Sequence, residues 1–148
     1  MDHIMTVKTG FLLVLACIGG AIGNYLGGVD ASLWVLLIMM GMDIVTGVMI
    51  AALWTDSPKT ETGGLESNAM FKGLCRKIIM LVAIGICAQL DVVLGTSALR
   101  PAAVFFFIGN EGLSLLENWG IMGVPYPPKM KEVLEILRKR GDSDGDAK

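Results

Sequence analysis

Long apolar runs alternate with short polar segments along the chain. Thr9–Val29 contains no charged residue, and Ala31–Trp54 contains only Asp43. A third run, Ile78–Leu99, contains only Asp91. Because a helix rises about 1.5 Å per residue, about 20 apolar residues cross the roughly 30 Å hydrocarbon core of a bilayer. The pattern therefore predicts three membrane-spanning helices.

The fourth apolar run, Ala102–Met122, differs from the others because its polar residues share one helical face. Helical spacing brings together Asn110, Glu111, Ser114, Glu117 and Asn118. A helix with one polar and one apolar face can line an aqueous path or contact another subunit. We therefore expect a fourth span whose polar residues line a pore or form subunit contacts.

Two other interpretations of this helix stay open. Glu111 and Glu117 can instead form hydrogen bonds inside the bundle of one subunit. Arg100 or Asn118 would then be the partner. The helix can also remain near the membrane surface until a signal triggers its insertion.

The segments between and after the apolar runs are polar. Thr55–Lys77 is a predicted loop, in which Ala69–Lys77 can form a short interfacial helix. Pro125–Pro128 ends the fourth helix, because proline cannot continue the backbone hydrogen bonds. Lys129–Arg140 has the apolar stripe of an amphipathic helix, and Gly141–Lys148 is predicted to be a disordered tail.

The basic residues predict the orientation. The chain has 12 Lys and Arg residues. With four spans and both termini in the cytoplasm, only Arg100 lies outside, as the positive-inside rule favours. The predicted fold is an all-α integral membrane protein with four transmembrane helices (residues 1–124) and a cytoplasmic amphipathic helix with its tail (residues 125–148). The basic residues expected at the membrane surface are Arg76, Lys77, Arg138, Lys139 and Arg140.

Asp43 and Asp91 interrupt strongly apolar spans. An ionised carboxylate near the bilayer centre costs about 2.5–3.5 kcal/mol, so each needs a partner, water or a proton. Asp43 shares a helical face with small residues, which allow close helix contacts. We expect helix contacts at Asp43, Thr46, Gly47, Asp91 and the glycine stripe Gly19, Gly23 and Gly27. The alternatives are a single hydrogen bond within the bundle and a proton or ion relay through the two aspartates.

Composition narrows the class of protein. The chain is 53% hydrophobic, and its mean hydropathy of +0.63 is that of a membrane protein. A net charge of −2 gives no reason to expect nucleic-acid binding. The cysteines are odd in number, at 3, and neither a metal motif nor a nucleophile–base pair stands out. We therefore expect no enzyme, no metal and no cofactor.

Five short motifs occur in an order and spacing that resemble the toxin-secretion/phage-lysis holin family. They extend from about Ala31 to Arg140, and they are Met42–Gly47, Gly73–Lys77 before an apolar span, Asp91 within it, Asn110–Asn118, and Gly123–Pro127 before a basic helix. The resemblance implies a small phage or prophage protein of the bacterial cytoplasmic membrane. It implies homo-oligomers that form lesions through which an endolysin, or in some hosts a toxin, is released. Members are often described with three spans.

Two other functions fit the same residues. A small multimeric ion channel or proton-coupled transporter would conduct along Asp43, Asp91 and Glu111. A membrane anchor would instead use the polar loop and the C-terminal helix to recruit a cytoplasmic protein. Current without protein release would indicate the channel, and an intact membrane potential would indicate the anchor.

Overall fold

The computed structural model describes residues 2–54 and 67–143, and nearly all of them are helical. The elements are α1 (Asp2–Tyr25), α2 (Ala31–Met49) with a short π-helix η1 (Ile50–Trp54) at its end, α3 (Ser67–Leu94), α4 (Leu99–Ile121) and α5 (Pro128–Ser143). The predicted all-helical class is therefore confirmed.

Three helices are long and apolar enough to cross a membrane. Among the described residues they cover Val7–Tyr25, Ala31–Leu53 and Ser67–Leu94. The helix α4 is not among them, because Arg100, Glu111 and Glu117 interrupt its apolar sequence. Three helices thus have the length and composition expected for the first three spans, but the third is Ser67–Leu94 instead of Ile78–Leu99, and Leu99 begins α4. The fourth span and the orientation stay predictions.

Several boundaries differ from those that the sequence predicts. The helix α1 ends at Tyr25, where Gly27 adopts a φ of 75° and the Gly28 N–H donates to the Gly23 carbonyl at 2.8 Å. Such an end favours glycine because the backbone is left-handed there. The helix α3 begins at Ser67, so the expected short helix Ala69–Lys77 is helical but continuous with the apolar run instead of separate from it. The first part of the expected loop, residues 55–66, lies outside the described residues.

The C-terminal helix is also longer than predicted. It extends to Ser143, so residues 141–143, which the sequence assigns to a disordered tail, are helical. The expected disorder of residues 144–148 falls outside the described part of the chain.

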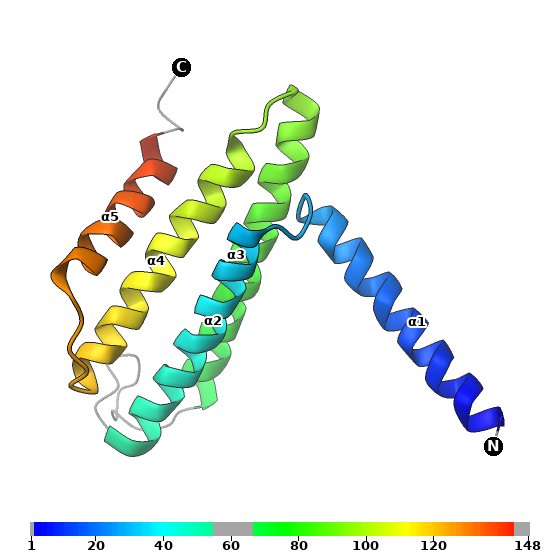
Figure 1. The fold of residues 1–148 in the computed structure, drawn as a ribbon, viewed down its shortest axis with the longest axis horizontal. Coiled ribbons are helices and arrows are strands. Elements are labelled where there is room, and N and C mark those ends of the chain that lie inside the picture. The colour runs from blue at the N-terminus through cyan, green and yellow to red at the C-terminus, as the bar shows by residue number, and fades with distance from the viewer. Residues whose placement is uncertain (1, 55–66, 144–148) are drawn as a thin grey trace.

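The helices α2, α3 and α4 form a bundle, and α5 lies along the outer side of α4 (Figure 1). Each bundle helix contributes to one apolar core, whose buried members include Leu33, Leu36, Met40, Met80, Ile84, Val104 and Ile108. In Figure 1, α1 projects away from this bundle and touches it only near its C-terminal end.

Buried positions recur at intervals of three and four residues in all three bundle helices. In α3 they include Lys77, Met80, Ile84, Ala88 and Asp91. This spacing is that of helices packed lengthwise, where side chains interdigitate along a common seam. Several seam positions therefore hold charged or polar residues where an apolar core would hold leucine or valine.

The contact between α4 and α5 is close because glycines of α4 leave room for the backbone of α5. A Cβ built at Gly109 would lie 2.6 Å from the Arg138 backbone nitrogen and 2.7 Å from the Leu134 carbonyl oxygen. A Cβ at Gly112 would lie 2.5 Å from a methyl carbon of Leu134. The buried Leu134 thus fits directly over two glycines.

Candidate functional site

Lys77 lies at the centre of a group of polar side chains inside the bundle. Its ammonium donates to Asp43 Oδ2 of α2 at 2.9 Å and to Glu111 Oε2 of α4. Lys77 is only 7% exposed, and Glu111 is 3% exposed. One ammonium therefore links all three helices of the bundle.

Asn118 extends this group toward the end of α4. Its amide nitrogen donates to Asp43 Oδ1 at 3.0 Å and to Thr46 Oγ1 at 2.8 Å. The Thr46 hydroxyl donates back to the Met42 carbonyl at 2.9 Å. We call these five residues the buried polar cluster: Asp43, Thr46, Lys77, Glu111 and Asn118.

Burial of the charged groups in the cluster is offset by the pairing of the Lys77 ammonium with the Asp43 and Glu111 carboxylates. Moving one ion from water into a protein interior costs several kcal/mol, and the opposite charge must offset that cost. Two carboxylates share one ammonium, and Asn118 adds an uncharged donor. Among the side chains that the structure describes, at residues 7–53 and 67–139, no buried nitrogen or oxygen lacks a hydrogen-bond partner. The buried polar atoms of the cluster therefore all have partners.

Asp91 has a separate role at the other end of α3. Its carboxylate accepts from the backbone N–H groups of Ala98, Leu99 and Arg100 at 3.2, 3.1 and 2.8 Å. The Thr96 hydroxyl donates to it at 2.5 Å. These contacts satisfy donors at the start of α4, where a helix favours negative charge. At 1.5 Å per residue, Asp91 lies about 21 Å along α3 from Lys77, so the two aspartates are not in one site.

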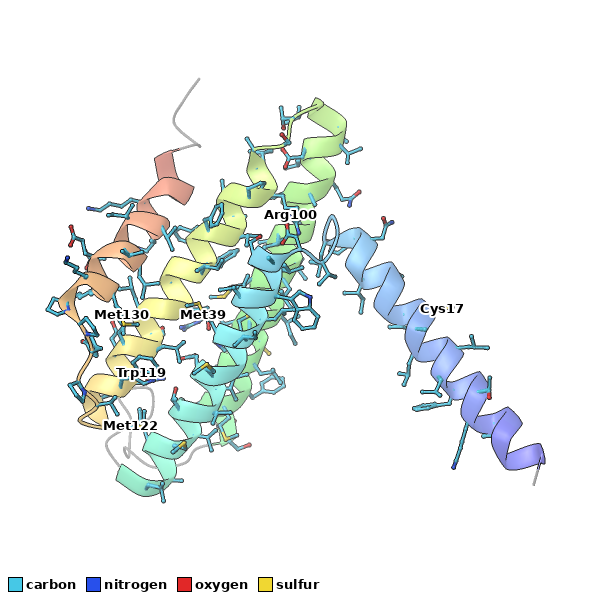
Figure 2. The ribbon with its side chains drawn as sticks, viewed as in Figure 1. Cys17, Met39, Arg100, Trp119, Met122 and Met130 are labelled. Atoms are coloured by element: carbon cyan, nitrogen blue, oxygen red, sulfur yellow. The ribbon has the colours of Figure 1, made fainter. Side chains whose placement is uncertain are left out.

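Arg100 connects the α1–α2 turn to the start of α4 (Figure 2). Its guanidinium donates to the Leu26 carbonyl at 2.6 Å, the Gly28 carbonyl at 2.7 Å and Asp30 Oδ2 at 2.7 Å. Asp30 also caps α2, because its Oδ1 accepts from the Leu33 N–H at 2.9 Å. The hydrogen bond from Arg100 holds the pKa of the Asp30 carboxyl well below its ordinary value.

The residues of the predicted polar stripe of α4 differ in burial. Glu111 and Asn118 face the bundle interior, Asn110 and Ser114 are half-buried, and Glu117 is exposed. In this single subunit the arrangement of Glu111 matches the alternative of internal polar packing, with Lys77 as its partner instead of Arg100 or Asn118.

The other predicted residues also lie in different places. A Cβ placed on Gly19 would have no neighbour within 4 Å, whereas Gly23 approaches Val29 and Gly27 approaches Arg100. Gly47 is half-buried beside the cluster residue Thr46. Of the five residues expected at the membrane surface, the described side chains of Arg76 and Lys139 are exposed, Arg138 is half-buried and Lys77 is buried; the side chain of Arg140 is outside the described ones.

The spacing of residues in the sequence indicates that Lys77 is buried, although a count of basic residues places it at the membrane surface. Lys77, Met80, Ile84 and Asp91 follow one another at intervals of three, four and seven residues, so Lys77 continues the buried seam of α3. Assigning Lys77 to a loop conceals this register. The pairing of Arg100 with Asp30 has no comparable signal, because 70 positions separate the two residues.

Comparisons with known proteins point to one family. The bacteriophage holin family matches residues 20–139 of the chain. A protein of Listeria monocytogenes is 34% identical over 127 residues, which cover 84% of this chain and 85% of the relative. A protein of Clostridium perfringens is 34% identical over 116 residues, covering 77% and 82%.

A phage protein is among the similar sequences. The probable holin of Bacillus phage phi105 is 30% identical over 125 residues, covering 84% of each chain. No solved structure matches the chain. Because the family match covers most of the sequence and includes every residue of the buried polar cluster, this chain belongs to the bacteriophage holin family.

Proposed function

We propose that this protein is a holin of the bacterial cytoplasmic membrane. Copies accumulate, homo-oligomerise and form lesions that release an endolysin, or in some hosts a toxin, and the host cell lyses. Family membership and the probable holin of phage phi105 support this role. The observation that carries it is a charged cluster enclosed in an otherwise apolar bundle, because such groups can either stay hidden or face water.

In the proposed topology, α4 crosses the membrane as a fourth span and both termini are cytoplasmic. The difficulty with this span is the cost of placing charged side chains in lipid. The contacts of Glu111 and Asn118 support it, because both side chains face Lys77, Asp43 and Thr46 instead of the bundle surface.

Lesion formation requires many copies and a rearrangement of α4. In one subunit the polar face of α4 is occupied by α2 and α3, and its glycine face is occupied by α5. We propose that in the assembled state Glu111 and Asn118 leave Lys77 and Asp43 and face a water-filled lumen. Water then replaces the partners that the cluster supplies in the closed bundle.

The test is release of a cytoplasmic muralytic enzyme from cells that express this protein. We expect a delay, then abrupt collapse of the membrane potential together with release of the enzyme. Glu111→Leu with Glu117→Leu should block or delay release, because the lumen loses its charged groups. If the double variant lyses cells on the schedule of the natural protein, α4 does not line the lesion.

The second candidate is a small multimeric ion channel or proton-coupled transporter. The row of buried ionisable groups Asp43, Lys77 and Glu111 favours it, because intramembrane ionisable residues often belong to ion pathways. This candidate predicts selective currents that change with Asp43→Asn and no passage of folded proteins. Loss of potential without enzyme release would therefore favour the channel over the holin.

A further inference from the structure

An apolar groove lies along the first half of α3, on a different side from the buried polar cluster. Its volume is about 410 Å³, within the roughly 300–1,000 Å³ of small-molecule sites. Phe71, Cys75, Ile79 and Ala83 of α3 line it together with Phe107 of α4. We call it the α3 groove.

Two basic residues line the same groove. Lys72 and Arg76 are one helical turn apart and both are exposed. Among the described residues, neither forms a salt bridge with a carboxylate. The sequence of α3 also contains no Asp or Glu before Asp91. The groove therefore combines a positively charged segment with walls made of hydrocarbon and aromatic side chains.

The position of the two charges along α3 matches the depth of a lipid headgroup. Ser67–Leu94 has 28 residues, which corresponds to a length of about 42 Å. That length equals the roughly 40–45 Å of a bilayer including its headgroup regions, so the first turns of a spanning α3 lie among headgroups. Lys72 and Arg76 precede the uninterrupted apolar run that begins at Ile78, and Ala83 lies deeper.

We propose that the α3 groove binds one anionic phospholipid. Lys72 and Arg76 hold the phosphate of its headgroup, and one acyl chain lies against Ile79, Ala83 and Phe107. The charge complementarity selects an anionic lipid, because a zwitterionic headgroup adds a cation that these two residues repel. This site does not depend on lesion formation, so it can be correct whether or not the protein is a holin.

The test uses the full-length protein in nanodiscs of mixed phosphatidylglycerol and phosphatidylcholine, with bound lipids counted by native mass spectrometry. We expect preferential retention of phosphatidylglycerol. Lys72→Gln with Arg76→Gln should lower that preference by on the order of tenfold. Lys129→Gln with Lys131→Gln is the matched control, because it removes the same charge from exposed positions of α5 and should retain the preference.

A second variant tests the contribution of the apolar wall to lipid binding independently of the two basic residues. Ala83→Phe fills the groove while both basic residues remain, so it should also reduce lipid retention. Retention that is unchanged in either groove variant would overturn the proposal. Equal loss in the α5 control would do so too, because it would show a general effect of net charge.

Cys75 gives a measurement on the unaltered protein, which remains valid if a variant fails to fold. It lines the groove and is half-buried. In bicelles, phosphatidylglycerol should slow maleimide labelling of Cys75 several-fold relative to phosphatidylcholine. Inorganic phosphate, which lacks acyl chains, should not protect Cys75. Absence of lipid protection, or equal protection by phosphate, would contradict a lipid site.

Discussion

Lys77 Nζ lies 2.9 Å from Asp43 Oδ2, and this buried ion pair connects the middle of α3 to the middle of α2. Both side chains occupy positions that packing would otherwise assign to apolar residues. The pair therefore determines which faces of the helices can meet, since a shifted register would leave each charge without its partner.

Removing the ammonium should destabilise the bundle strongly. Lys77→Met leaves Asp43 and Glu111 buried without a cation, and loss of one partner of a buried pair costs about 3–5 kcal/mol. Thermal unfolding in detergent, followed by circular dichroism, measures the loss. Arg76→Met is the control, because Arg76 is the exposed neighbour in the same helix. Equal effects of the two substitutions would show that Lys77 does not hold the bundle together.

The lysis schedule should depend on the contact between Lys77 and Glu111. Glu111→Gln keeps a polar group for a lumen but replaces the ion pair with a weaker hydrogen bond from the Lys77 ammonium to an uncharged amide oxygen. If the closed bundle must release Glu111 before lesions form, this variant should lyse cells earlier than the natural protein. Glu117→Gln also keeps a polar group for a lumen, but Glu117 is exposed and is not among the described partners of Lys77, so this variant should keep the normal schedule. Unchanged or later lysis by Glu111→Gln would argue against release of this contact as the limiting step.

A side chain at Gly109 should separate α5 from α4. Gly109→Val places a Cβ 2.7 Å from the Leu134 carbonyl oxygen and 2.6 Å from the Arg138 backbone nitrogen, so the helices must move apart. Trypsin should then cleave α5 several-fold faster at Lys131 and Arg138. Gly120→Ala is the matched control, because a Cβ there meets nothing within 4 Å. Cleavage of the Gly109→Val protein at the rate of the control would show that α5 does not depend on this close approach.

Acid should weaken the connection between Arg100 and Asp30. The folded-state pKa of Asp30 is lowered, chiefly by the Arg100 hydrogen bond, so its stabilisation is complete above the ordinary carboxyl pKa of about 4 and is lost as pH falls below that value. Because the Asp30 side chain is 50% exposed, solvent screening limits the contribution, and we expect about 1 kcal/mol or less.

Asp30→Asn isolates this charge, since asparagine still caps a helix. The difference in unfolding midpoint between the natural protein and the variant should shrink between pH 6 and pH 3. A difference that stays constant over this range would show that the charge of Asp30 contributes nothing.

The sequence predicts most helices because each apolar run is long enough to specify a span by itself. Ala31–Trp54 is helical throughout, and the polar stripe of α4 correctly indicates a helix of mixed character. The expected short helix Ala69–Lys77 is also helical, but it is the start of α3 and continuous with the apolar span. The sequence does not reveal the role of Lys77, because its pairing with two other helices is a property of packing.

The candidate site is predictable in part. Asp43, Glu111 and Asn118 are conspicuous in the sequence because polar residues in apolar helices need partners. The identity of the partner is a property of packing: Glu111 meets Lys77 because α3 and α4 pack side by side in the fold. Arg100 could equally serve Glu111 on sequence grounds, yet it contacts the α1–α2 turn instead.

The isolation of α1 has a consequence for its behaviour in membranes of different thickness. Its described side chains are almost all exposed, with Cys17 among them, and it meets the bundle only near Tyr25 and the following turn (Figure 2). A helix without lateral protein contacts takes its tilt from the mismatch between its apolar length and the hydrocarbon thickness. In an isolated subunit the angle between α1 and the bundle should therefore follow the bilayer and differ between thin and thick membranes, while α2, α3 and α4 keep their mutual packing.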